Sequence, residues 1–525
     1  MSQASTRVSD HITDACSGVC RRAAEVAALA VLLGPVCALA IGLLDSPGAG
    51  PAVFSFGARR LGLLGKSALV AAGVSLGSVA IAVIAATRLA RVRGTAAAVL
   101  KSLLLVLAAV PPDIHAFAWS TAMLAVTDRL AAIGVSAMLL QGWPAVFAVE
   151  CMAMLPLTVV VAWVGMDVVE PALVEAARPY APDQTVFARV ALPLAAPILG
   201  LAAAVVFLLS LMDYCVPSLF SVNGYAIEVF AQYSADGSPA AAACVALPLV
   251  ALAAGMMVAC VALWRGVASS SPQGGHRVLA HMVWPRWWRA LQVACLTIVS
   301  LQASAPILVL TLHAGGFSTM ANTLIAALPE IRYTAVNAVV AAAMSIPLGA
   351  AAGARLAAGG RWSRFWWIAV CIPLALPASL SGIGVISLSR QLPAWAAILA
   401  PPVVLVSRFM PLAALLVYGR LRRLDSGLMD AARVHQENGI QTFWLVWRPI
   451  LSPALRVSAG IVIAFSLCEL GASILVAPPG RPPLAVRLYN LLHYGASDQV
   501  AALCLALMGA AFIVGTSVTV ALRRR

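Results

Sequence analysis

Long apolar runs are the feature that most constrains this chain of 525 residues. A helix needs about 20 mostly apolar residues to cross a bilayer. Hydrophobic residues make up 62% of the chain and charged residues only 10%, too few charges to cover a soluble fold of this length. The alternation typical of outer-membrane barrel strands is absent. We therefore expect an all-α polytopic membrane protein with about twelve spans, near 24–44, 67–87, 96–121, 144–166, 191–212, 240–264, 289–312, 334–357, 365–388, 395–418, 450–473 and 499–521.

Two segments of the chain repeat at a fixed spacing. The first, Glu175–Pro193, reads EAARPYAPDQTVFARVALP, and the second, Asp430–Pro449, reads DAARVHQENGIQTFWLVWRP. Their starts lie 255 positions apart (430 − 175) and their final prolines lie 256 apart (449 − 193). Upstream, Pro156 and Pro411 are also 255 apart (411 − 156). Repetition in register predicts two homologous halves of six spans each.

The distribution of arginine sets the expected orientation. Placing both termini in the cytosol leaves 23 arginines in cytosolic segments and 7 in outer segments, as the positive-inside rule requires. Arg59 and Arg60 fit this topology poorly. The net charge of +14 thus reflects orientation in the lipid bilayer, and no nucleic-acid partner is expected. The predicted organisation is a cytosolic tail over 1–23, a first transmembrane domain over 24–267, a cytosolic linker over 268–288 and a second transmembrane domain over 289–525.

Both repeated segments open with an acidic residue, two alanines and an arginine. An anionic side chain beside free backbone N–H groups stabilises a helix start, and alanine favours the helix. We therefore expect short helices to begin at Glu175 and at Asp430. In the linker, three tryptophans lie close to Arg286 and Arg289, a mixture that suits a helix end at the headgroup layer.

The two segments resemble the EAA loops of the membrane subunits of ATP-binding-cassette (ABC) importers. That pattern is EAA, three residues, glycine, nine residues and a hydrophobic-x-Leu-Pro ending. The second segment has the family length, with Gln436 at the glycine position, and the first keeps Leu192-Pro193 but is one residue shorter. The stretch ELGASILVAPPGRPPLAVRLYNLLHYGASDQVAAL also resembles fused permeases for iron(III), 2-aminoethylphosphonate and related substrates, as do VPPDIHAFAW and ALPASLSGIG.

The resemblance implies a fused two-domain permease subunit in a bacterial inner membrane, with the fold of a type I importer. It would pass a small solute, such as iron(III) or a phosphonate, from a periplasmic substrate-binding protein to the cytosol. Two ABC ATPase subunits would hydrolyse the ATP, so this chain is expected to be no enzyme and to hold no cofactor. The residues that the resemblance assigns to ATPase coupling are Glu175, Ala176, Ala177, Arg178, Pro193, Asp430, Ala431, Ala432, Arg433 and Pro449.

Two other classes remain as alternatives. A secondary active transporter can have two six-helix halves, but it lacks paired acid-Ala-Ala loops before the fifth span of each half. An integral membrane enzyme would need a cluster of His, Asp or Glu at one membrane face. The seven histidines are scattered, and no metal site is expected.

Ionisable residues inside apolar runs are costly and often functional. Asp213 and Glu469 lie 256 positions apart (469 − 213), so we expect them at equivalent outer ends of the two fifth spans. They would either face a translocation path and attract a cation, or tether their own outer loops. Glu150 and Arg408 lie mid-span in matching helices, and we expect them to form a structural ion pair between the halves.

Overall fold

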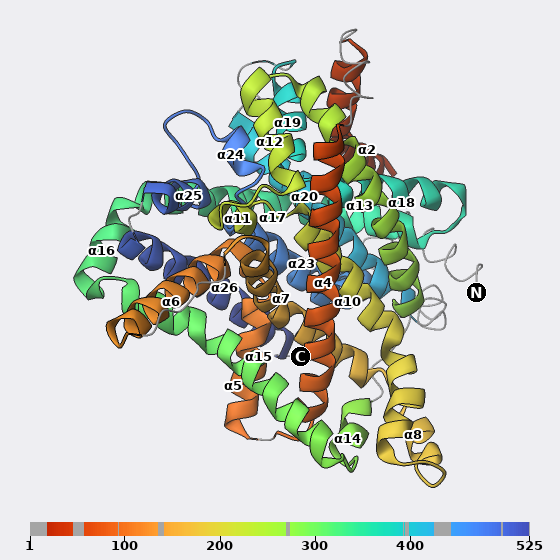
Figure 1. Cartoon of the computed structure of the whole chain (residues 1–525). Helices are drawn as coiled ribbons and strands as arrows, with labels where there is room; N and C mark the ends of the chain where they lie inside the picture. Colours follow the sequence, from red (N-terminus) through yellow and green to blue (C-terminus); the bar gives the residue numbers. More distant parts are fainter. Residues whose placement is uncertain are drawn as a thin grey trace.

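The computed structural model describes residues 18–45, 57–92, 94–134, 141–268, 274–391, 393, 398–424, 443–494 and 497–523, and the regular elements in this part are all helices (Figure 1). Ten of them are long and apolar enough to cross a membrane. The all-α membrane fold expected from the apolar runs is thereby confirmed. The ten are α2 (Gly18–Leu44), α4 (Ala58–Leu89), α7 (Gly142–Asp167), α10 (Leu192–Met212), α13 (Pro239–Val267), α15 (Arg286–His313), α17 (Leu328–Ala357), α20 (Ala400–Arg422), α23 (Arg448–Leu467) and α26 (Ser497–Arg523).

Two further apolar segments are sharply bent helix pairs. The helix α5 (Thr95–Leu107) meets α6 (Pro112–Ala132) at 114°, and α18 (Gly360–Ala375) meets α19 (Ala378–Ser389) at 109°. Counting each pair as one span gives twelve candidate spans within the described residues. Extended prolines, Pro111 and Pro377, separate the two members of each pair. Proline lacks a backbone N–H and disfavours helix in the residue before it, so the chain leaves one helix and starts another.

Shorter helices connect the long ones. They are α8 (Pro171–Ala177), α9 (Asp183–Val186), α11 (Cys215–Leu219), α12 (Tyr225–Asp236), α14 (Gly275–Ala280), α16 (Gly316–Ala326), α24 (Ser473–Val476) and α25 (Leu484–Tyr494). Five-residue π-helical turns, η1 (Phe187–Ala191) and η3 (Phe443–Trp447), lead into α10 and α23.

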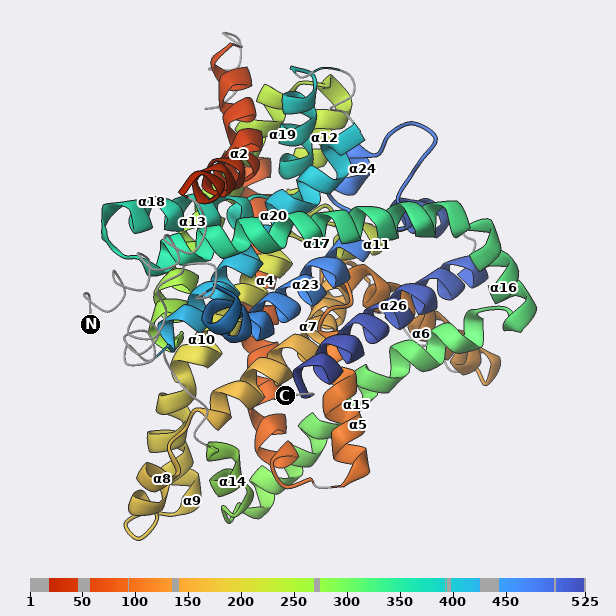
Figure 2. The same ribbon diagram turned by 180° about the vertical axis from the view of Figure 1, so that it is seen from behind.

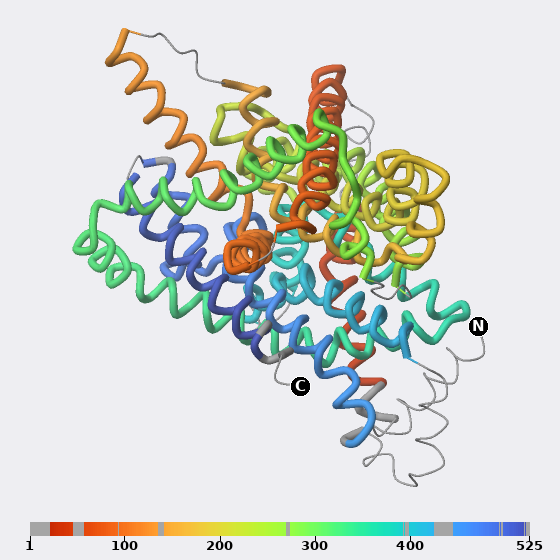
Figure 3. The backbone as a smooth tube through the Cα atoms, turned by 90° about the horizontal axis from the view of Figure 1, so that it is seen from below, coloured from red at the N-terminus to blue at the C-terminus, as the bar shows by residue number. Residues whose placement is uncertain are grey.

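The long helices make corresponding contacts in the two parts of the chain. In the first half, up to residue 268, α4, α7 and α10 pack against one another, and in the second half α17, α20 and α23 do the same. The first long helix of each half, α2 or α15, is exchanged, in that it packs against the group of the other half. Helix α2 packs against α17 and α19, and the green α15 crosses the orange-red α4 and also contacts α6 (Figures 1 and 3). The two groups therefore share their hydrophobic cores.

Polar side chains fix both exchanged helices. Arg355 of α17 pairs with Glu25 of α2 at 2.7 Å, and Gln292 of α15 donates to the Thr87 hydroxyl of α4 at 2.8 Å. The approach of α2 to α19 is close: a Cβ on Gly384 would lie 2.6 Å from the Pro35 carbonyl oxygen. Glycine at this position lets the two backbones touch, as small residues do in membrane helix packing.

The start of α4 explains the two arginines that fit the expected topology poorly. Arg59 pairs with Glu228 of α12 at 2.6 Å, and Arg60 lies 3.8 Å from the same carboxylate. Arg60 also donates to Gln232 at 2.9 Å. Glu228 therefore offsets part of their positive charge, and both arginines tie the start of α4 to the α12 segment that covers this end of the molecule.

Candidate functional site

The first repeated segment forms a short arm at one end of the molecule. Figures 1 and 2 show α8 and the turn after it extending away from the long helices. The expected helix start at Glu175 is wrong, because α8 begins at Pro171 and ends at Ala177. Proline suits the first helical position, since its φ is already helical and its missing N–H is not needed there. Glu175 consequently lies in the last turn.

The arm presents a small, mixed surface. Glu175 and Ala176 are exposed, and the Tyr180 side chain is 90% exposed, whereas Val174 is buried against the body. Ala177 and Arg178 are half-buried. Alternating exposure over one helical turn leaves one face of α8 anchored and the other open to solvent or to a partner.

Charge-assisted hydrogen bonds hold the turn after α8. Arg178 binds the Asp183 carboxylate with two nitrogens, Nε at 2.9 Å and Nη2 at 3.2 Å. The same guanidinium donates to the His281 carbonyl at 3.4 Å, and the Val283 backbone N–H donates to Asp183. Bidentate arginine–carboxylate pairs fix geometry as well as adding energy. The expected coupling residue Arg178 therefore shapes the arm and ties it to the linker.

The linker is packed firmly behind the arm. A Cβ on Gly275 would lie 2.4 Å from the carbonyl oxygens of both Met166 and Val169, so only glycine fits where α14 meets the end of α7. The Trp284 ring is buried and packs edge-on against Phe187 at 5.3 Å between centroids. The α8 arm and the turn after it therefore pack against residues of the linker as well as against helices of the first half.

The second repeated segment is described only at its end. Asp430, Ala431, Ala432 and Arg433 lie outside the described residues, whereas Pro449 is in the first turn of α23. The same local structure, a π-helical turn, precedes the end proline of each repeated segment. Turns η1 and η3 start 256 positions apart (443 − 187), and each ends two residues before the exposed Pro193 or before Pro449. A wider π turn relieves the clash of a proline ring with the carbonyl four residues earlier.

A second site lies where α10 and α23 end. The Asp213 carboxylate accepts hydrogen bonds from the backbone N–H groups of Cys215 at 2.9 Å and Val216 at 3.4 Å, at the start of α11. Glu469 accepts one from Ala472 at 2.9 Å, before α24. Both carboxylates thus cap the short helix that follows them, a role that satisfies free N–H groups.

The ion pair expected between Glu150 and Arg408 is wrong. The Arg408 guanidinium lies 3.3 Å from the Glu469 carboxylate, with side chains 20% and 9% exposed. Glu150 is fully buried and accepts a hydrogen bond from the Ser210 hydroxyl of α10. Each group finds its partner in the next long helix of its own half, because α20 packs on α23 and α7 packs on α10.

A further carboxylate, which the sequence interpretation missed, belongs to the same region. Asp113 is half-buried in the first turn of α6, directly after the Pro111 break, and lies within electrostatic reach of Asp213 and Glu469. The sequence signal that could have identified Asp113 is an acidic residue directly after two prolines inside an apolar run. The acidic centre thus comprises four carboxylates, Asp113, Glu150, Asp213 and Glu469, and one arginine, Arg408.

Both helix breaks border the acidic centre. Asp113 starts α6, and a Cβ on Gly471, two residues after Glu469, would lie 2.4 Å from the Ala378 Cβ at the start of α19. The same point is 3.3 Å from Cε1 of Tyr214 and 3.5 Å from the Glu469 carboxylate. Within the described residues, no three His, Cys, Asp or Glu side chains converge as metal ligands would.

Comparison with known proteins points to distant permeases. The putrescine transport system permease protein PotI of Escherichia coli is 25% identical over 183 residues, covering 33% of this chain and 65% of the relative. The Fe(3+)-transport system permease protein FbpB 2 of Haemophilus influenzae is 34% identical over 109 residues, 21% of each chain. The matched part therefore spans less than two thirds of either relative. No family model matches the chain.

Proposed function

We propose that this chain is the membrane-spanning permease subunit of an ATP-driven, binding-protein-dependent importer, with both transmembrane domains fused and the division near residues 268–288. The observation that carries the proposal is the α8 arm, whose exposed acid-Ala-Ala face extends from the helical body at a place that the sequence repeats. The partial likeness to two permease proteins supports the same class. In this scheme the chain lies in a bacterial inner membrane with both termini in the cytosol.

The arm offers a suitable surface for an ATPase subunit. Ala176 and Glu175 are exposed on α8, and Tyr180 projects just beyond its end. The turn is stiffened by the Arg178–Asp183 pair, so a push on α8 would pass through η1 into α10. The equivalent surface in the second half would be formed by Asp430 to Arg433. Two ATPase subunits would then engage the two arms, while ATP remains on those partners.

The acidic centre is the proposed location of the solute path. Three carboxylates, Asp113, Glu150 and Asp213, have no ion-pair partner among the described residues, and only Glu469 has one. A carboxyl group without a cationic partner in a low-dielectric region favours an approaching cation over an anion, because the cation stabilises its ionised form. The two relatives are named for putrescine and Fe(3+), which are both cations. We therefore favour a small cationic solute delivered by a periplasmic binding protein.

Uptake measurements with arm variants test the coupling proposal. In Ala176→Glu and Ala177→Glu, each combined with Ala432→Glu, a new carboxylate would block docking, so ATP-dependent uptake and the ATP hydrolysis that co-purifies with the tagged chain should fall. Ala235→Glu adds the same charge to an exposed position on α12, at the opposite end of the molecule, and should leave both activities unchanged (Figure 1). Normal uptake and an intact complex in both double variants would contradict the proposal.

Charge removal tests the path. Asp213→Asn combined with Glu469→Gln keeps one acceptor oxygen at each cap, for the Cys215 and Ala472 N–H groups, but removes both charges. A path that recruits a cation predicts lost uptake with normal insertion and normal basal ATP hydrolysis. Because Arg408 already compensates Glu469, Asp213→Asn alone should carry most of the effect. If uptake survives in the double variant, the two carboxylates only tether their loops.

A further inference from the structure

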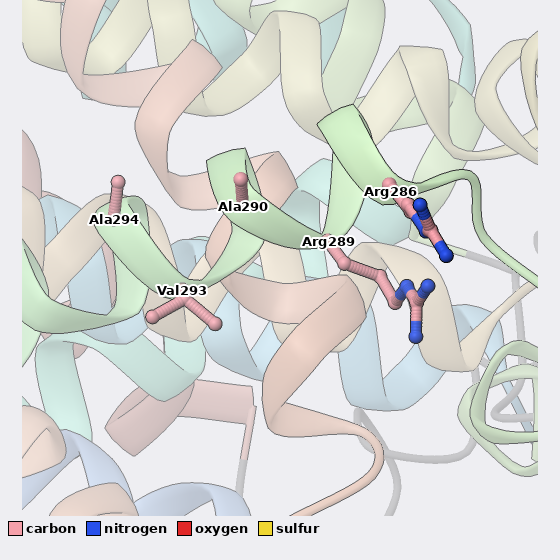
Figure 4. A pocket seen from close by; sticks show the side chains of 5 residues that line it. All are labelled: Arg286, Arg289, Ala290, Val293 and Ala294. Carbon is pink, nitrogen blue, oxygen red and sulfur yellow. The ribbon is translucent and has the colours of Figure 1, made fainter.

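A shallow groove lies along the first turns of α15. It is open along one face of the helix, has a volume of about 520 Å³ and is lined by Arg286, Arg289, Ala290, Val293 and Ala294. Figure 4 shows the two arginine side chains at one end of the groove, with the small apolar side chains following along the helix. One end is therefore cationic and the rest is apolar.

The positive charge at this end is concentrated and weakly compensated. The last turn of α4 brings Arg88 and the nearby Arg91 to the same region, and burial together with the charges of Arg88 and Arg289 lowers the pKa of Arg91. Asp183 is the acidic group in reach of Arg91, and its oxygens already bind Arg178 and the Val283 N–H. Among the residues that the structure describes, no carboxylate pairs with Arg286 or Arg289.

The apolar part of the groove continues along the outer face of α15. Val293, Leu301 and Leu308 are each 49–59% exposed, on a helix long and apolar enough to span a membrane. Trp287, between the two arginines, is 62% exposed. Exposed tryptophan and arginine at the end of a span mark the headgroup layer, and exposed leucine and valine beyond them face acyl chains. This face is therefore complementary to a molecule with an anionic head and an apolar tail.

We propose that the groove binds one anionic phospholipid, with its phosphate between Arg286 and Arg289 and an acyl chain along Val293 and the apolar face beyond it. Arginine suits this role because its planar fork binds phosphate oxygens through two parallel hydrogen bonds. Basic pockets beside membrane helices bind lipid headgroups through the same chemistry. The bound lipid would brace the junction of α4, α15 and the linker from outside.

Native mass spectrometry of the full detergent-purified chain tests the site. The probes are phosphatidylglycerol and phosphatidylcholine with identical acyl chains, and the first binding event is measured. One basic side chain at an anionic surface contributes about fivefold in affinity, so Arg286→Ala with Arg289→Ala should weaken phosphatidylglycerol binding about 25-fold. Lysine at both positions keeps the charge but loses the planar fork, so its affinity should lie between those of the wild type and the alanine variant. Phosphatidylcholine binding should be weak in every variant.

The chain supplies a matched control. Arg361 and Arg364 have the same spacing in the first turn of α18, are exposed, and flank Trp362, which is 61% exposed. Changing both to alanine should leave the first phosphatidylglycerol affinity unchanged. The proposal is overturned if this control loses as much affinity as the α15 variant, or if the wild-type chain does not prefer phosphatidylglycerol. Displacement of the lipid by millimolar inorganic phosphate would also overturn it, by showing a site for free phosphate.

Discussion

Replacing Arg408 by methionine would leave the Glu469 carboxylate without its cation in a largely buried position. The two charged groups approach to 3.3 Å, and the Glu469 side chain is only 9% exposed. At an effective dielectric constant of about 20, charges about 4 Å apart attract with about 4 kcal/mol, and removing one partner of a buried pair typically costs about 3–5 kcal/mol. Because the Arg408 side chain is still 20% exposed, we expect a loss near the lower limit, about 3 kcal/mol.

A double-mutant cycle isolates this interaction. The free energy of unfolding is measured in mixed micelles for Arg408→Met, Glu469→Gln and the double variant. Glutamine keeps an oxygen for the Ala472 N–H, so the cycle removes the charge and retains the cap. The double variant should be more stable than the sum of the single losses by about 2–3 kcal/mol, because it leaves no unpaired buried charge. Additive losses, or an Arg408→Met variant as stable as wild type, would refute the reasoning.

The remaining predictions concern the buried carboxylate of the first half and two close backbone contacts. Glu150→Gln replaces a buried carboxyl group that has no cationic partner among the described residues and keeps an oxygen for the Ser210 hydroxyl, so thermal stability should stay equal or rise; a clear drop in Tm would contradict this. Gly275→Val places side-chain atoms against the Met166 and Val169 carbonyls, so limited proteolysis should cut the linker faster than in wild type, with Gly266→Val, at an open position on α13, as the control. Gly384→Val should separate α19 from α2 and cost about 1–3 kcal/mol by overpacking, visible as a lower Tm, whereas Gly255→Val, at a position open on α13, should cost little.

The apolar runs were sufficient to predict the helical spans because length and hydropathy alone decide whether a segment can cross a membrane. They did not show that 96–121 and 365–388 bend by more than 100°. The prolines in VPPDIHAFAW and ALPASLSGIG indicated a helix break in each segment, but a proline does not set the direction of the helix that follows. The direction of the next helix depends on its packing, here α6 on α7 and α15, and α19 on α2.

The repeat predicted which helices correspond but not which side chains meet. Glu150 and Arg408 occupy the matching helices α7 and α20, but Glu150 meets Ser210 of α10 and Arg408 meets Glu469 just after the end of α23. Asp213 and Glu469 lie just after the ends of α10 and α23, and each caps the helix after it. Their place in a solute path remains a proposal. Asp113 was missed because its importance arises only when the broken helix brings it to the acidic centre.

The exchange of α2 and α15 has a consequence for biogenesis. Helix α2 leaves the ribosome before α19, against which it packs and which begins 334 residues after α2 ends (378 − 44). At a synthesis rate of about 5–20 residues per second, α2 waits roughly 15–70 s in the bilayer before that partner exists. In the same way, the faces of α4 and α6 that contact α15 have no such partner until α15 has been synthesised. A gene cut at the linker would thus yield two fragments that complete each other only after assembly, whereas one polypeptide keeps each nascent half close to its complement.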